Sequence, residues 1–199
     1  MARKKSVKLA CTTFRQESQK ILAWTTVPAD LGDVEDPEYE FWLYDYAVIR
    51  LYRAFERLML ECLAGAINND TAALSTRTGF IWPKHLTDEV CEYVIQGDGY
   101  FDFRSRDGLI AVVKRFLPDG HYLVQAVHER KYKKALDQMS ALRNFAAHDS
   151  KRAKRAVLRA TEQTGIRSAG VWLSRNNRLK SIVEDLRRFA DEVASAAPY

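Results

Sequence analysis

The chain has 199 residues, 29% of them charged, and a mean hydropathy of −0.34, which fits one globular domain and excludes a disordered chain or a membrane span. Its three cysteines lie far apart and form no C-x-x-C pair, so neither a disulfide framework nor a structural zinc site is expected. The basic N-terminus is followed by no apolar stretch, so we expect no secretory signal and a location in the reducing cytoplasm, with no membrane partner.

The net charge of +5 is unevenly distributed along the chain. Residues 1–103 carry 11 Lys and Arg against 16 Asp and Glu, whereas residues 104–199 carry 20 against 10. A basic half on a compact domain favours a polyanionic partner, with nucleic acid first and an anionic membrane surface second. The alternative is a dipolar surface that serves only solubility.

The N-terminal third predicts two helices joined by an acidic linker. Residues 9–24 form the first helix, and residues 30–45 contain seven Asp and Glu without Lys or Arg. Asp36 and Pro37 are typical of a helix N-cap and first position. From Pro37 to about residue 67, apolar side chains recur at three- and four-residue spacing, which predicts the strongest helix.

Four further helices are predicted downstream. They cover residues 86–95, 106–116, a long basic stretch from 129 to beyond 155, and 178–194. The fold class is therefore all-α, an up-and-down helical bundle with extra peripheral helices and loops. Residues 1–36 form an N-terminal helix and acidic linker, residues 37–199 form the main helical domain, and together they make one compact unit.

One short motif carries chemistry. Arg143, Asn144 and His148 fall within six positions of the basic helix. Asn144 and His148 are four residues apart and share a helix face, whereas Arg143 and His148 are separated by about 140° around an ideal helix. They would converge through the long arginine side chain or across a shared cleft. The structural alternative is a histidine near a helix end with Arg143 in a surface salt bridge.

Arg143-Asn144-x-x-x-His148 resembles the R-x(4–6)-H signature of the HEPN superfamily. Residues 100–105, 114–121 and 147–150 extend the likeness to the RiboL-PSP-HEPN branch over about residues 37–195. The resemblance implies a homodimeric helical bundle with a composite active site, which acts as a metal-independent endoribonuclease in toxin–antitoxin systems, antiviral (phage) defence or RNA processing. An antitoxin or sensor protein is then an expected partner.

The residue types suit RNA cleavage independently of the resemblance. RNA supplies its own nucleophile, the 2′-OH, so the protein needs proton transfer and charge stabilisation at phosphorus. Histidine, with an ordinary pKa near 6.5, transfers protons at neutral pH, and the arginine fork suits phosphate oxygens. Asn144 orients His148 or binds the phosphate. We therefore expect 2′,3′-cyclic phosphate and 5′-hydroxyl ends.

Glu56 is a second candidate, because HEPN proteins often place a polar residue on an earlier helix that faces the motif helix. There it would hold Arg143 in place or tune His148. The alternative is an i,i+3 pair between Glu56 and Arg53 on a solvated face. Arg53 and Arg57, one turn apart, are also candidates for phosphate contact.

Basic residues flank the motif on both sides and predict a track for the RNA backbone. The residues expected to bind RNA are Lys134, Lys151, Arg152, Lys154 and Arg155. The alternative is a solvated helix face.

No histidine has metal-ligand spacing and no phosphate-binding glycine loop occurs, so no metal and no cofactor are expected. The competing function is a non-catalytic HEPN dimerisation or binding module that partners an antitoxin, a nucleotidyltransferase or a sensor protein. A helical DNA-binding protein ranks third, because no short helix-turn-helix is evident.

Overall fold

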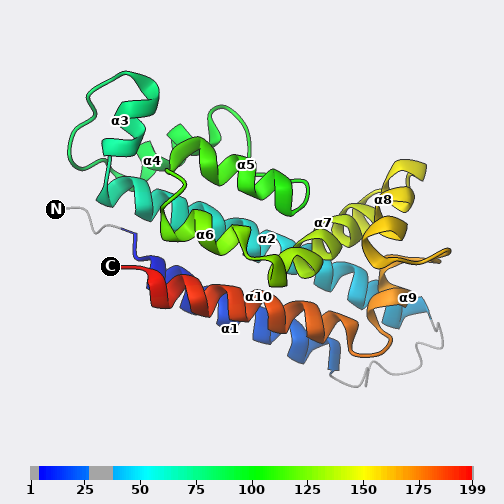
Figure 1. The fold of residues 1–199 in the computed structure, drawn as a ribbon. Helices are drawn as coiled ribbons and strands as arrows, with labels where there is room; N and C mark the ends of the chain where they lie inside the picture. The colour runs from blue at the N-terminus through cyan, green and yellow to red at the C-terminus, as the bar shows by residue number, and fades with distance from the viewer. Residues whose placement is uncertain (1–4, 27–37, 199) are drawn as a thin grey trace.

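The computed structural model describes residues 5–26 and 38–198. These residues form ten α-helices, one 3₁₀ helix and no strand, which confirms the all-α class (Figure 1). None of the described helices is both long and apolar enough to cross a membrane. The elements are α1 (Val7–Thr26), α2 (Glu38–Asn69), α3 (Ala72–Thr78), α4 (Asp88–Gln96), α5 (Arg106–Phe116), α6 (Tyr122–His128), η1 (Arg130–Tyr132), α7 (Lys133–Ala147), α8 (Lys151–Thr161), α9 (Ala169–Leu173) and α10 (Arg178–Ala196).

The bundle is built around α2, whose 32 residues make it the longest described helix. Helices α1, α7 and α10 pack against α2 and against one another in part. Phe55 on α2 contacts Phe14 of α1 and Phe189 of α10, with ring centroids 5.7 and 5.4 Å apart. The predicted apolar stripe of α2 is buried at these contacts, which supplies the hydrophobic stabilisation of the core.

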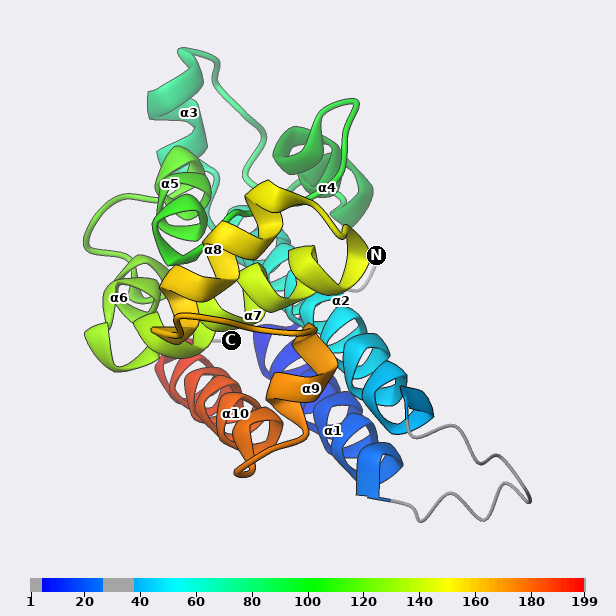
Figure 2. The same cartoon turned by 90° about the vertical axis from the view of Figure 1, so that its right-hand side faces the viewer.

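The remaining helices cover this core. Helices α3, α5 and α6 lie on the same side of α2 in both views (Figures 1 and 2), whereas α8 and α9 lie toward the end of the bundle at which α2 begins (Figure 1). Helix α4 packs on α2, α8 packs on α7, and α9 packs on both α2 and α7. The sequence did not predict α3, α6 and α9, because each has seven residues or fewer and shows too little of a helical repeat.

The predicted helix boundaries agree with the structure at both ends of the chain. Residues 106–116 are helical as expected, and the first and last helices extend the predicted ranges by a few residues. Part of the predicted acidic linker, residues 38–45, belongs to α2. The expected N-cap at Asp36 and Pro37 and the boundary before residue 37 lie outside the described residues.

The predicted long basic helix is wrong, because the structure divides it into η1, α7 and α8. Helix α7 ends at Ala147, and His148 and Ser150 have extended backbones. The Ser150 hydroxyl accepts the Ala153 backbone N–H at 3.1 Å and so caps α8. The break lets α8 fold back onto α7 and bury Ala153 and Val157 instead of continuing into solvent.

Candidate functional site

Arg143 lies on α7, where two contacts hold its guanidinium. The Cζ atom is 4.5 Å from the ring centroid of Tyr52, a fully buried residue of α2. Nη1 donates a hydrogen bond to Asn144 Oδ1 at 2.8 Å. The cation–π contact and the hydrogen bond restrict the arginine to one region. The two roles expected for Asn144 are to orient His148 or to bind the phosphate. The structure adds a third role, because Asn144 also orients Arg143.

His148 lies at the junction between α7 and α8. Its backbone N–H donates to the Asn144 carbonyl at 3.0 Å, and its own carbonyl accepts the Ser150 N–H at 2.7 Å. The side chain is exposed. Because His148 lies beyond the end of α7, the separation of 140° expected on a continuous helix does not apply to it.

Arg143, Asn144 and His148 line one groove of about 950 Å³, here called the motif groove. The structure therefore brings the three motif residues to one concave surface. Three further arginines line this groove, and within the described residues none of them has a carboxylate at ion-pair distance. Their positive charge is thus available to an anion. They are Arg104, Arg152 and Arg159.

The five residues predicted to bind RNA do not form one track. Arg152 lines the motif groove, because it shares a face of α8 with Ala156 and Arg159. Three more of the predicted residues are exposed on α8 but do not line that groove; they are Lys151, Lys154 and Arg155. Lys134 lies near the start of α7 and lines a separate cavity with Asp185.

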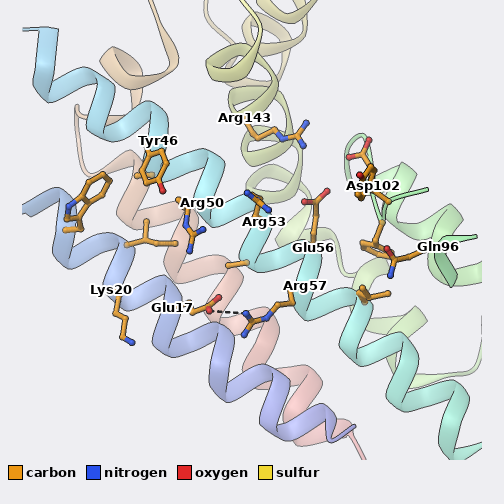
Figure 3. Close-up of a pocket in the computed structure, with 17 residues that line it drawn as sticks. Glu17, Lys20, Tyr46, Arg50, Arg53, Glu56, Arg57, Gln96, Asp102 and Arg143 are labelled. Carbon is orange, nitrogen blue, oxygen red and sulfur yellow. Dashed lines mark ion pairs between the residues drawn. The ribbon is translucent and has the colours of Figure 1, made fainter. Parts of the chain in front are cut away.

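Glu56 is partly buried on α2 and lines a second, larger groove of about 1150 Å³ between α1, α2 and α7, here called the α1–α2 groove (Figure 3). Burial, opposed by the Arg143 guanidinium and assisted by the nearby Asp102 carboxylate, raises the pKa of Glu56 to about 7. Glu56 forms no ion pair within 4 Å with Arg53 or with Arg143, so neither the expected surface pair nor a direct hold on Arg143 is observed. Of the two guanidinium groups, that of Arg143 has the larger electrostatic effect on Glu56.

Tyr52 and Asp102 complete the surroundings of Arg143. The Tyr52 hydroxyl lies 2.8 Å from Asp102 Oδ1 and also contacts the Phe103 carbonyl oxygen. Burial raises the pKa of Tyr52, so this hydroxyl stays protonated. Sequence reasoning did not select either residue. The available signal was Tyr52 itself, one turn before Glu56 within the apolar stripe, because a buried tyrosine hydroxyl needs a polar partner.

Metal-ligating side chains do not gather in the part of the chain that the structure describes, where no group of three or more His, Cys, Asp or Glu is placed to hold an ion. Two carboxylates of the motif groove are engaged by the protein. Asp137 accepts the Arg106 backbone N–H at 2.9 Å and the Lys133 ammonium at 2.6 Å, and Asp102 contacts Tyr52. These contacts anchor the groove walls.

Substituting glutamine for Glu56 is expected to stabilise the protein at alkaline pH. The folded protein holds the Glu56 pKa near 7, above the ordinary 4.5, so the fold favours the protonated form. The contribution of Glu56 to the free energy of unfolding is therefore fully present below about pH 4.5. It is lost as the pH rises through 7 and the carboxyl group ionises. With solvent screening of a partly exposed group, Glu56→Gln should increase the free energy of unfolding at pH 8 by about 1–2 kcal/mol and leave it unchanged at pH 4.

Urea denaturation across this pH range would measure the effect. Glu184→Gln is the matched control, because Glu184 is an exposed carboxylate of α10 whose one ion pair among the described residues is with Lys180 at 3.9 Å. Its substitution should leave the slope of stability against pH unchanged. Parallel curves for wild type and Glu56→Gln would show that Glu56 does not titrate in this range.

Comparison with known proteins yields no relative: the chain matches no protein-family model, no curated protein and no solved structure. The likeness to HEPN proteins therefore rests on the motif at residues 143–148 and on its flanking sequence alone.

Proposed function

We propose that this chain is a metal-independent endoribonuclease of the HEPN type. The observation that carries the proposal is the motif groove, where Arg143, Asn144 and His148 lie with three arginines that have no ion-pair partner among the described residues. An RNA backbone is a polyanion that carries its own nucleophile. The groove offers it positive charge for the phosphate oxygens and one solvent-accessible imidazole for one of the two proton transfers.

In the proposed reaction, the 2′-oxygen attacks the adjacent phosphorus and the imidazole of His148 accepts the 2′-hydroxyl proton. The bond from phosphorus to the 5′-oxygen breaks, and that oxygen takes up a proton. Arg143, held by Asn144 and Tyr52, balances the charge that develops on the non-bridging oxygens. The products are a 2′,3′-cyclic phosphate and a 5′-hydroxyl.

This reaction uses one base and one acid, whereas the motif groove of one chain contains a single histidine. A second copy of the chain would supply the second imidazole. The proposal therefore includes a homodimer with a composite active site. By the resemblance, such an enzyme acts as a toxin or phage-defence effector with an antitoxin or sensor protein as its regulator, and the cysteine pattern supports a location in the cytoplasm.

The test is incubation of the purified chain with a mixed RNA pool in EDTA, followed by analysis of the cut ends. Fragments with 2′,3′-cyclic phosphate and 5′-hydroxyl ends are expected, because attack by the 2′-OH needs only the protein's own groups. Ends with 5′-phosphate would contradict the 2′-OH mechanism. RNA that stays intact at every protein concentration would contradict the nuclease proposal and favour the binding module.

A further inference from the structure

The α1–α2 groove adjoins the motif groove. Arg143 and Asp102 line both, so the two concave surfaces meet at these side chains. Figure 3 shows Arg143 above the row of arginines on α2, with Asp102 at the same end as Gln96. An extended ligand that leaves the motif groove past Arg143 therefore enters the α1–α2 groove.

The centre of the α1–α2 groove is positively charged. Arg50 and Arg53, one helical turn apart, and Lys20 of α1 are exposed and line it, and none of the three has an ion-pair partner within the described residues. Arg57 differs, since it pairs with Glu17 at 3.3 Å and Glu61 at 3.5 Å. The two unpaired arginines thus lie on the part of α2 nearer to its N-terminus, and Lys20 faces the groove from α1.

Exposed aromatic rings line the same groove. Trp24 and Tyr46 are 43% and 50% exposed, and their rings meet edge to face with centroids 5.3 Å apart. Tyr100, at the other end, is 94% exposed. Aromatic faces beside unpaired cations are typical of surfaces that bind single-stranded nucleic acid, where bases stack on rings and phosphates contact the cations. A groove for an apolar protein segment would not carry three unpaired cations.

We propose that the α1–α2 groove binds the single-stranded RNA that flanks the scissile phosphate. Arg50 and Arg53 contact its backbone, and one unstacked base lies against Trp24 and Tyr46. This inference rests on the proposed function and extends it, because it defines the substrate as a single strand that reaches beyond the cleavage point.

Binding is measured in a His148→Ala background with labelled single-stranded RNA of about three and about ten nucleotides. The longer strand should bind more tightly, and Arg50→Ala/Arg53→Ala should remove most of that gain, about 10- to 100-fold. The slope of log affinity against log salt should fall by about 1.4, since each phosphate contact contributes about 0.7 on a single strand.

The matched control is Arg77→Ala/Arg115→Ala, which removes two exposed arginines that line neither groove. Its affinity should change by less than about twofold, apart from a small general charge effect. Equal losses in the two double variants would overturn the inference, since any two arginines would then act alike.

The stacking of bases on Tyr46 and Trp24 can be measured separately from the phosphate contacts. Tyr46→Ala should weaken binding of the longer strand by about tenfold, whereas Tyr93→Ala, which removes an exposed ring outside both grooves, should not. RNA should also quench tryptophan fluorescence in the parent and much less in Trp24→Phe. Equal quenching in both would contradict stacking on Trp24.

The two proposals fail separately. Cleavage of the RNA pool with binding unaffected by Arg50→Ala/Arg53→Ala would overturn only the flanking-strand site. Intact RNA, together with binding that still depends on Arg50 and Arg53, would overturn the nuclease proposal and leave the groove as a single-strand binding site.

Discussion

Replacing His148 by alanine is expected to reduce RNA cleavage by about 10³-fold or more while the fold stays intact. General acid–base groups contribute about 10²- to 10⁴-fold each, and in a composite site the substitution removes one such group from each subunit. The imidazole is exposed and no side-chain hydrogen bond to it is found within the described residues, so its loss leaves no buried group unsatisfied. The free energy of unfolding should change by less than about 0.5 kcal/mol.

Single-turnover cleavage would measure the loss of activity, and thermal melts of the same preparations would measure the stability. His128→Ala is the matched control, because His128 is exposed at the end of α6 and lines neither groove. It should cleave within about twofold of wild type. Full activity in His148→Ala would assign the reaction to other residues and refute the role of the motif.

Replacing Gly170 by alanine is expected to cause the largest loss of stability. A Cβ at this position would lie 1.9 Å from the Phe41 carbonyl oxygen and 3.2 Å from Asp45 Cγ. The Gly170 backbone N–H also donates to Asp45 Oδ1 at 2.6 Å, so α9 and α2 approach too closely for a side chain. Since backbone atoms must move to relieve the overlap, the cost should be about 3 kcal/mol.

For a chain of this length, that cost corresponds to a fall in melting temperature of about 6–12 °C. Gly120→Ala provides the comparison, because a Cβ there meets nothing within 4 Å. It should melt within about 2 °C of wild type. A similar melting temperature for Gly170→Ala would show that α9 does not pack against α2 as described.

The helices that could be predicted are those with a long apolar repeat. In α2 and α10 the buried side chains recur over about four turns or more, and α5 keeps the pattern over about three. The junction at residues 148–150 could not be located by periodicity, because it is short and basic residues lie on both sides of it. Its local signal was Ser150, an N-cap residue type inside the basic stretch, and its cause is tertiary: α8 buries Ala153 and Val157 against the bundle.

The candidate site likewise contains residues that the sequence could predict and residues that it could not. Arg143, Asn144 and His148 are close in the sequence, so a motif could find them together. Asp102 and Tyr52 are 50 residues apart and meet only because the segment after α4 folds over α2. Arg104 and Arg159 likewise reach the motif groove from separate elements, so no spacing rule relates them to His148.

The position of His148 also determines how its distance from Arg143 would respond to a change in their spacing along the chain. Inside a helix, each added residue would rotate the histidine by about 100° and carry it away from the arginine. Here the arginine lies on α7 and the histidine lies just beyond its end, in a three-residue connection to α8. An added residue would lengthen this connection without rotating the histidine around a helix axis. The direction of a histidine at such a junction is therefore not fixed by the 3.6-residue helical repeat. Its distance from the arginine depends on the angle and spacing between the two helices that the junction connects.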